Sequence, residues 1–503
     1  MGCTTILVGK RASYDGSTIV ARNDDDGNGT FTEKRFAIVA PKDQPRTYTS
    51  VIGKLTIELP ANPMRYSCIP NALPEKEGIW AAAGINEANV GMTATETITS
   101  NDRVLAADPL VDYQKAEGEP GTAGYRPEVP GGIGEEDITT ICLPYIRSAR
   151  EGVKLLGSYL ERYGTYEMNG IAFHDADEIW WLETVGGHHW IARRVPDDCY
   201  VAASNQQGID RFDLDDALGA GKDFLCSADL ADFMDQNNLD LTMRSDNGVG
   251  YDGERPHVFN PRLAFGTNSD SDHIYNTPRT WSIQRHLNPH ACTWDGPAAD
   301  LTPESDDIPW CRIPEHKLTI QDVKYVLSDH YKSTPYDPYG LADTPDLRHC
   351  YRPIGINRTD VVTATQIRGT GPKEYAAVQW FGFFSNVYNA FVPQFVHVDA
   401  VPDYFTNTGS DISCDNLYWT SRIIGCLSDP IHKHVIADIE RYQENVFAQT
   451  QRVLRETTLN QTPCAGANDK IATVVKKLTD ELLATVLHAS SMHMLNSFAR
   501  SDH

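Results

Sequence analysis

The sequence predicts an α+β fold in which helices pack on antiparallel sheets. The chain opens with two short β-favouring runs joined by a tight turn, residues 4–8 and 17–21. Two helical segments before residue 163 are followed by four strands in quick order, and two long amphipathic helices lie near the end of the chain. With 503 residues and a hydrophobic content of 41%, the chain can bury a substantial core.

The net charge restricts the classes of partner. The chain has 69 acidic and 44 basic residues and a formal charge of −25. Nucleic acids and anionic membrane surfaces would repel such a protein, so we expect neither as a partner. No apolar run approaches the roughly 20 residues of a membrane span, and the first residues lack the basic-then-apolar pattern of a secretory signal. We therefore expect a cytoplasmic protein.

The cysteine spacing indicates reduced thiols. The eleven cysteines form no C-x-x-C pair, so neither a structural zinc site nor an iron–sulfur cluster is expected. His286 and His290 have the spacing of a helical metal pair, but Pro289 between them interrupts such a helix. We expect no metal and no other cofactor.

The first predicted hairpin is placed directly after a cysteine. Residues 4–8 are β-branched and apolar, Asp15-Gly16 is typical of a tight turn, and residues 17–21 again favour a strand. Cys3 stands at the edge of the first strand. A cysteine without further context is more often a small buried hydrophobe than a reactive group.

A terminal cysteine carries a nucleophile and a base in one residue. If Met1 and Gly2 are removed, the thiolate of Cys3 can attack, and its α-amine, with a pKa near ~8, can accept the thiol proton. The second strand returns beside the first and is followed by Arg22 and Asp25. Arg22 can stabilise the thiolate and Asp25 can hold the ammonium group.

These residues resemble a known family. Residues 3–10 (CTTILVGK) and 13–25 (SYDGSTIVARNDD) are similar to the start of the cysteine dipeptidases of the dipeptidase A type. Those enzymes are N-terminal-nucleophile hydrolases related to penicillin V acylases, bile salt hydrolases and the secernins. The resemblance implies a four-layer αββα sandwich with large insertions over residues 3–400, a removed propeptide at 1–2, and a mainly helical extension over 401–503 that packs on the core.

The resemblance also implies an activity, the hydrolysis of dipeptides through a thioester on Cys3. Two alternatives stay open: an amidase for non-peptide acyl-amides, as in the penicillin V and bile salt branch, and a secernin-like protein with little catalysis. Removal of the initiator Met leaves Gly2 attached to Cys3, so a second cleavage is needed. We hypothesise that Cys3 performs it.

A second hairpin is predicted over residues 79–97, where two runs of small and apolar residues flank a turn at 86–89. By its resemblance to the related hydrolases, Glu96 falls near the substrate and can receive the ammonium group of a dipeptide. The alternative is a strand-end glutamate in solvent. Residues 98–136 are polar and rich in proline and glycine, which indicates a lid or an oligomer contact.

Helices are expected over residues 138–145 and from 149 to 162, the second opened by a capping box at Ser148 and Glu151. Four strands follow, at residues 169–174, 178–183, 189–195 and 200–203. Directly after the fourth strand stands Asn205, whose amide can donate to an oxyanion. In the related hydrolases an Asn at this position forms the oxyanion hole, whereas an isolated Asn would indicate only a turn.

Residues 207–274 are acidic and rich in loops, and no elements are assigned to them. The segment 275–285 resembles the one in which the related hydrolases carry their second active-site arginine, which would be Arg279. Arg285 in the same segment is the alternative, and either can be an ordinary surface arginine.

The last part of the chain predicts one more hairpin and two helices. Residues 374–383 and 387–396 form an aromatic, buried pair of strands that completes the sandwich. One helix has Asp429 as its N-cap, and the last begins at about residue 469. Their apolar stripes indicate core or a subunit interface, and we expect a homo-oligomer.

Overall fold

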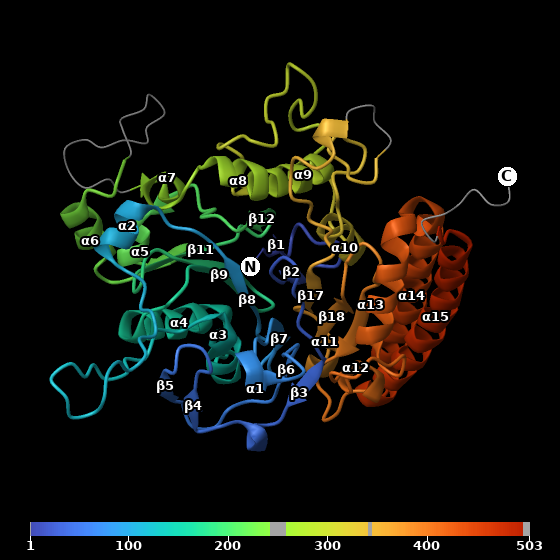
Figure 1. Ribbon diagram of the computed structural model, residues 1–503, viewed down its shortest axis with the longest axis horizontal. Coiled ribbons are helices and arrows are strands. Elements are labelled where there is room, and N and C mark those ends of the chain that lie inside the picture. Colours follow the sequence, from blue (N-terminus) through green and yellow to red (C-terminus); the bar gives the residue numbers. More distant parts are fainter. Residues whose placement is uncertain (1, 242–257, 341–344, 496–503) are drawn as a thin grey trace.

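The computed structural model describes residues 2–241, 258–340 and 345–495. Two antiparallel sheets stack face to face, and helices cover the outer face of each (Figure 1). The chain therefore forms a four-layer αββα sandwich, which confirms the predicted fold class.

The first hairpin lies in the interior of the first sheet. β1 (Thr4–Val8) pairs with β2 (Thr18–Asp25) on one side and with β12 (Tyr200–Ser204) on the other. The seven strands follow the order β16-β12-β1-β2-β17-β18-β19. The other strands of this sheet are β16 (Cys311–Arg312), β17 (Thr359–Ile367), β18 (Ala377–Phe383) and β19 (Val392–Phe395).

The second sheet has six strands in the order β14-β11-β10-β9-β8-β7. They are β7 (Ala83–Ile85), β8 (Gly91–Thr97), β9 (Asn169–His174), β10 (Ile179–Thr184), β11 (Trp190–Arg194) and β14 (Phe224–Cys226). The hairpin predicted over residues 79–97 is confirmed as β7 and β8. Of the four strands predicted after the helices, three join this sheet, while β12 crosses to the first sheet and lies beside β1.

Side chains along β1 alternate between two apolar layers. Leu7 joins Val20 and Trp181 in the layer between the two sheets. Ile6 and Val8 point the other way, into the core beneath the helices that cover the first sheet. This alternation fixes which face of the sandwich each neighbouring side chain reaches.

Two helices, α3 (Glu135–Cys142) and α4 (Ala149–Tyr163), cover the outer face of the second sheet. The Ser148 side chain caps α4 by accepting the backbone N–H of Glu151 at 3.2 Å, as predicted. The second half of the capping box does not form, because the Glu151 carboxylate accepts the N–H of Arg147 at 2.7 Å.

Helices on the first sheet come from the second half of the chain. They are α9 (Thr277–Leu287), α10 (Ile320–Leu327), α13 (Leu417–Ser428), α14 (His432–Asn460) and α15 (Cys464–Met492). The last three lie side by side at the edge formed by β18 and β19 (Figure 1). Apolar residues four to seven apart, such as Val435, Ile439 and Val446, turn one stripe of α14 into the core.

Several boundaries differ from the predictions. β17 was not predicted, although its β-branched residues favour a strand. Asp429 was predicted to cap a helix, but it lies in the 3-10 turn Asp429–Ile431 that joins α13 to α14. The last helix begins at Cys464, because residues 464–468 continue its buried stripe. The polar segment 98–136 contains the short helix 102–107 and the first two residues of α3, and part of 207–274 lies outside the described residues.

Smaller elements fill the connections. The strands are β3 (Ala37–Val39), β4 (Thr47–Thr49), β5 (Thr56–Glu58), β6 (Tyr66–Cys68), β13 (Phe212–Asp213) and β15 (Val258–Phe259). The helices are α1 (Pro74–Glu77), α2 (Asp102–Ala107), α5 (Leu214–Leu218), α6 (Leu230–Asn237), α7 (Pro261–Phe265), α8 (Asp270–Tyr275), α11 (Lys373–Ala376) and α12 (Asp403–Thr406). Among the described residues, no helix combines the length and the apolar composition that a membrane crossing requires.

Candidate active site

Cys3 lies at the end of a central strand and is fully buried. It precedes β1 by one residue, and Thr4 pairs with Asn23 of β2 and with Ser204 of β12. The alternation along β1 places Cys3 on the same face as Thr5 and Leu7, between the two sheets. Groups from both sheets can therefore reach its thiol.

Charged side chains from β2, α3 and the segment after β2 meet beside Cys3. Arg22 of β2 donates from Nη2 to Asp24 at 2.7 Å and to Glu135 of α3 at 2.8 Å. Lys34 lies 2.8 Å from the second oxygen of Asp24. Burial opposes ionisation of Asp24, but Lys34 and Arg22 lower its pKa to about 2. These two basic and two acidic side chains form a buried cluster.

The thiol of Cys3 is held in its protonated form by its surroundings. Burial raises the pKa of Cys3 well above its ordinary value, and the carboxylates of Glu135, Glu96 and Asp24 raise it further. The guanidinium of Arg22 acts in the opposite direction and lowers the pKa. Ionisation of Cys3 therefore needs a base close to the sulfur, and Arg22 supplies the positive charge that stabilises the thiolate.

The other face of β2 carries a second ion pair. Asp25 accepts hydrogen bonds from Arg352 and, at 2.5 Å, from the hydroxyl of Thr359. The same Arg352 nitrogen donates to the carbonyl oxygen of Gly2. Arg352 thus joins Asp25 to the peptide group that precedes Cys3.

Asn205 and Arg279 meet at the end of β1. The Arg279 guanidinium donates to the Cys3 carbonyl, to Thr4 Oγ1 at 2.8 Å and to Asn205 Oδ1 at 2.6 Å. The Asn205 side-chain nitrogen donates to the carbonyl of Thr97 at 2.6 Å. Arg279 therefore fixes which end of the Asn205 amide points away from it.

Glu96 lies within this network and is 1% exposed. Its two oxygens accept hydrogen bonds from Thr5 Oγ1 at 2.6 Å and from the backbone N–H of Asn205 at 2.9 Å. Burial raises the pKa of Glu96 to about 7, although Arg279 lowers it. Its predicted role as the receptor of a substrate's ammonium group stays a prediction.

The structure brings five predicted residues together around Cys3 and separates a sixth. Arg22, Glu96, Asn205 and Arg279 lie around Cys3, and Asp25 reaches it through Arg352. Arg285, the alternative to Arg279, instead pairs with Asp295 at the surface, at 2.9 Å.

Sequence reasoning missed four members of the site: Asp24, Lys34, Glu135 and Arg352. Asp24 lies between the predicted residues Arg22 and Asp25, and Glu135 opens an acidic triplet that forms the first turn of α3. These are local signals that could have been used. Lys34 and Arg352 have no such signal, because only the folding of the chain brings them to the site.

Cys3, Asp24 and Glu135 each offer one ligand atom, and these three atoms lie within 4.8 Å of one another. Such a set can coordinate a metal ion in principle. Here, however, the Arg22 guanidinium already binds both carboxylates and supplies the positive charge. We assign no metal to this cluster.

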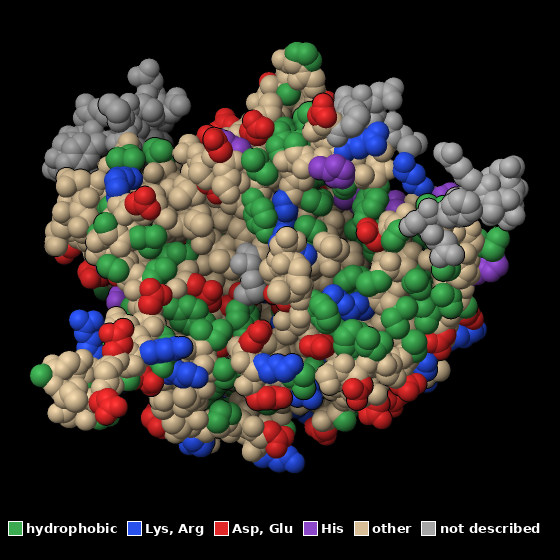
Figure 2. All heavy atoms as spheres, in the orientation of Figure 1, with side chains coloured by type: hydrophobic (Ala, Val, Ile, Leu, Met, Phe, Trp, Pro, Cys, Tyr) green, Lys and Arg blue, Asp and Glu red, His purple; other side chains and the backbone are tan. Residues whose placement is uncertain are grey.

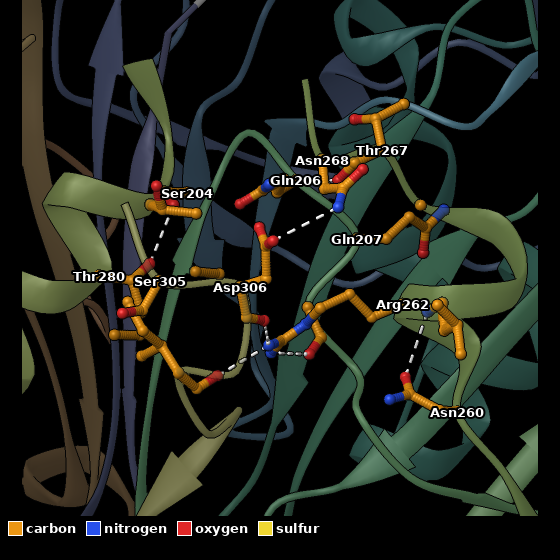
Figure 3. A pocket seen from close by; sticks show the side chains of 17 residues that line it. Ser204, Gln206, Gln207, Asn260, Arg262, Thr267, Asn268, Thr280, Ser305 and Asp306 are labelled. Atoms are coloured by element: carbon orange, nitrogen blue, oxygen red, sulfur yellow. Dashed lines mark hydrogen bonds between the residues drawn. The ribbon is translucent and has the colours of Figure 1, made fainter. Parts of the chain in front are cut away.

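A cavity of about 200 Å³ lies beside the end of β12 and does not include Cys3. Figure 3 shows Ser204 and Thr280 facing each other on one side and Arg262 on another. The Arg262 guanidinium is occupied by the backbone carbonyls of Gly208, Asp306 and Ile308. The cavity thus neighbours the candidate site but contributes none of its charged groups.

The αββα sandwich, with a cysteine at the start of a central strand, has the architecture of an N-terminal-nucleophile hydrolase. A model of peptidase family C69 matches residues 2–445, and the chain belongs to this family. It is 50% identical over 549 residues to a dipeptidase of Bifidobacterium longum, and the alignment covers all of both chains. It is 49% identical to a probable dipeptidase A of Streptococcus pyogenes, with the same coverage. Identity to dipeptidase A of Lactobacillus helveticus is 40%, over 96% of each chain.

Proposed function

We propose that this protein is a dipeptidase whose nucleophile is Cys3, freed by the removal of Met1 and Gly2. The observation that carries the proposal is the position of the Cys3 thiol beside Arg22, at the strand end where Asn205 and Arg279 also meet. The names of relatives that are 40% to 50% identical over nearly the whole chain support the substrate class.

The proposed reaction begins with transfer of the thiol proton to the α-amine of Cys3. The sulfur then attacks the scissile carbonyl, and the amide of Asn205 stabilises the oxyanion. The leaving amine takes the proton from the Cys3 ammonium, which leaves a thioester. Water hydrolyses the thioester and regenerates the thiol.

The surrounding charges fit these steps. Arg22 stabilises the thiolate, because it is the cation that lowers the pKa of Cys3. Asp25 holds the new ammonium group of Cys3 after Gly2 has left, since Arg352 joins its carboxylate to the Gly2 carbonyl. Arg279 orients Asn205 from the oxygen side of its amide.

A substrate panel tests this function. The purified protein is expected to hydrolyse dipeptides and to leave penicillin V and glycine-conjugated bile salts intact, and Cys3→Ala is expected to abolish hydrolysis. Cys414→Ala, at an exposed thiol, is the matched control and should keep full activity. Cleavage of the acyl-amides in preference to dipeptides would replace the proposal by an amidase. Absence of hydrolysis in correctly processed protein would favour a non-catalytic role.

Three further properties belong to this proposal. We propose that residues 3–400 form the hydrolase domain and that residues 401–503 are a helical extension packed on it. We propose a cytoplasmic location, supported by the net charge of −25 and by eleven free cysteines. We also propose a homo-oligomer, supported by the hydrophobic side chains gathered over the C-terminal helices in Figure 2.

A further inference from the structure

Glu135, one of the carboxylates that act on the Cys3 thiol, has a further carboxylate beside it, that of Glu167. The backbone N–H of Glu135, the first residue of α3, donates to Glu167 Oε1 at 2.6 Å. Glu167 lies two residues before β9 and is half-buried. The two side chains therefore lie next to each other at the end of the second sheet where the interior strand β9 begins.

Glu135 has an unused acceptor in a buried position. Its Oε1 accepts hydrogen bonds from Arg22 at 2.8 Å and from the Thr95 backbone N–H at 3.1 Å. Its Oε2 is buried and has no hydrogen-bond partner among the described residues, and the same holds for Thr95 Oγ1. Buried polar atoms without partners are costly, so a ligand that donates hydrogen bonds would be bound favourably here.

Among the described residues, the cations near this end of the sheet pair with Asp24 and Glu135 and leave Glu167 without a cationic side chain. Arg22 and Lys34 offset Asp24 and Glu135. Within the described part of the chain, no cationic side chain lies within ion-pair distance of Glu167. Burial and the neighbouring Glu135 raise the pKa of Glu167 to about 7, against the hydrogen bonds it accepts. A cation bound between Glu135 and Glu167 would relieve this repulsion.

The distance to the nucleophile fits an α-ammonium group. In a dipeptide the α-nitrogen is two bonds from the scissile carbonyl carbon, about 2.5 Å away. For attack, that carbon lies about 3–3.5 Å from the Cys3 sulfur. The α-nitrogen then lies about 4–6 Å from the sulfur. A carboxylate oxygen of Glu135 lies within 4.8 Å of the Cys3 sulfur. It can therefore bind the α-ammonium of a substrate in position for attack.

We propose that Glu135 and Glu167, in place of Glu96, form the subsite that binds the free α-ammonium group of the substrate; this rests on the dipeptidase function proposed above. Both oxygens of Glu96 already accept hydrogen bonds, from Thr5 and from the backbone N–H of Asn205. This subsite selects peptides with a free amino terminus. An acylated α-nitrogen has no positive charge and would leave the two carboxylates unpaired and desolvated.

Glu167→Gln tests the subsite directly. The substitution keeps the oxygen that accepts the Glu135 N–H and removes only the charge, without altering a residue that contacts Cys3. The two substrates are Ala-Ala and propionyl-alanine, which has hydrogen in place of the α-ammonium group. Wild type is expected to prefer Ala-Ala in kcat/KM by at least about 100-fold, and Glu167→Gln to reduce that preference about 10- to 100-fold, mainly through KM.

The matched control is Glu178→Gln, which removes a carboxylate that pairs with Arg150 and Arg194 at the start of β10. It should keep the wild-type preference. If Glu167→Gln lowered kcat/KM equally for both substrates, the residue would have a structural role and the subsite would be overturned. Equal kcat/KM values of the wild type for Ala-Ala and propionyl-alanine would also overturn it. A wild type that cleaves no dipeptide would instead refute the proposed function.

An inhibition measurement keeps the test informative if Glu167→Gln does not fold. Wild-type protein is assayed with alaninamide, which carries the α-ammonium group, and with propionamide, which lacks it. Alaninamide is expected to inhibit at least about tenfold more strongly than propionamide. Equal inhibition by the two amides would contradict an ammonium subsite.

Discussion

Neighbouring residues at the start of β1 face different partners, and this decides the chemistry around Cys3. The Cys3 thiol points between the sheets, toward Arg22 and Glu135, while Thr4 points toward Arg279. The thiol therefore meets the group that stabilises its anion, and the backbone carbonyl of Cys3 meets the arginine that orients Asn205. One strand end serves both the proposed nucleophile and the proposed oxyanion site.

Asn205→Ala tests the oxyanion role. Removing one such donor typically lowers kcat about 10²- to 10³-fold. This corresponds to a loss of roughly 3–4 kcal/mol of transition-state stabilisation, because the donor acts mainly in the transition state. We expect this loss in kcat with little change in KM. Asn237→Ala, at an exposed position on α6, is the control and should retain wild-type kinetics. A variant of Asn205 with full kcat would show that other groups bind the oxyanion.

At the scale of elements, a buried histidine joins the two sheets. His174 of β9 lies 2.9 Å from Thr18 Oγ1 of β2 and 2.7 Å from Thr365 Oγ1 of β17. Burial lowers the pKa of His174 to about 3. The imidazole is therefore neutral in the folded protein at pH values at which it would be charged in the unfolded chain.

In His174→Gln, the free energy of unfolding should fall less steeply than in the wild type as the pH is lowered below 7. A group with a lowered folded-state pKa contributes stability that is present above its unfolded pKa of about 6.5 and lost as the pH falls toward its folded pKa. Between pH 7.5 and pH 5, the free energy of unfolding of the wild type should therefore fall by about 2 kcal/mol more than that of the variant. Urea unfolding at both pH values measures this difference. An equal fall in the free energy of unfolding for the wild type and the variant would contradict a neutral His174 in the folded protein.

A helix protects the outer edge of the first sheet. Asn468 of α15 accepts the N–H of Phe395 and donates to its carbonyl, both at 3.0 Å, so it pairs with the backbone of the edge strand β19. Exposed strand edges are prone to unwanted pairing. This contact shows how a C-terminal helix completes the sandwich.

Asn468→Leu keeps the volume but leaves two backbone groups without partners. We expect the free energy of unfolding to fall by about 2–5 kcal/mol, as each buried unpaired group costs about 1–3 kcal/mol. Thr473→Val, on the exposed side of the same helix, is the control and should change stability little. A loss below about 0.5 kcal/mol for Asn468→Leu would mean that water replaces the side chain.

At the scale of the whole molecule, the predictable parts are those whose signal is local. The first hairpin, the candidate nucleophile and Arg22 lie within 25 residues, so turn chemistry and strand propensity were enough to predict them together. The αββα arrangement came from the family resemblance, because the pattern of strands and helices indicated only α+β.

The parts that were missed depend on contacts between distant segments. β17 lies between β2 and β18 although more than 300 residues separate it from β2. Glu135 and Arg352 enter the site from a helix N-terminus and a loop whose positions only the packed sheets define. Strand propensity cannot indicate which strands become neighbours, and an isolated arginine carries no signal of its ion-pair partner.

The intact mass of the purified, active protein shows whether Cys3 acts with a free α-amine. We expect a chain that has lost Met1 and Gly2 and begins at Cys3, together with a Cys3→Ala variant that retains Gly2 because it cannot cleave itself. Fully active protein that still begins at Met1 or Gly2 would contradict the proposed mechanism, because the α-amine would then be part of a peptide bond.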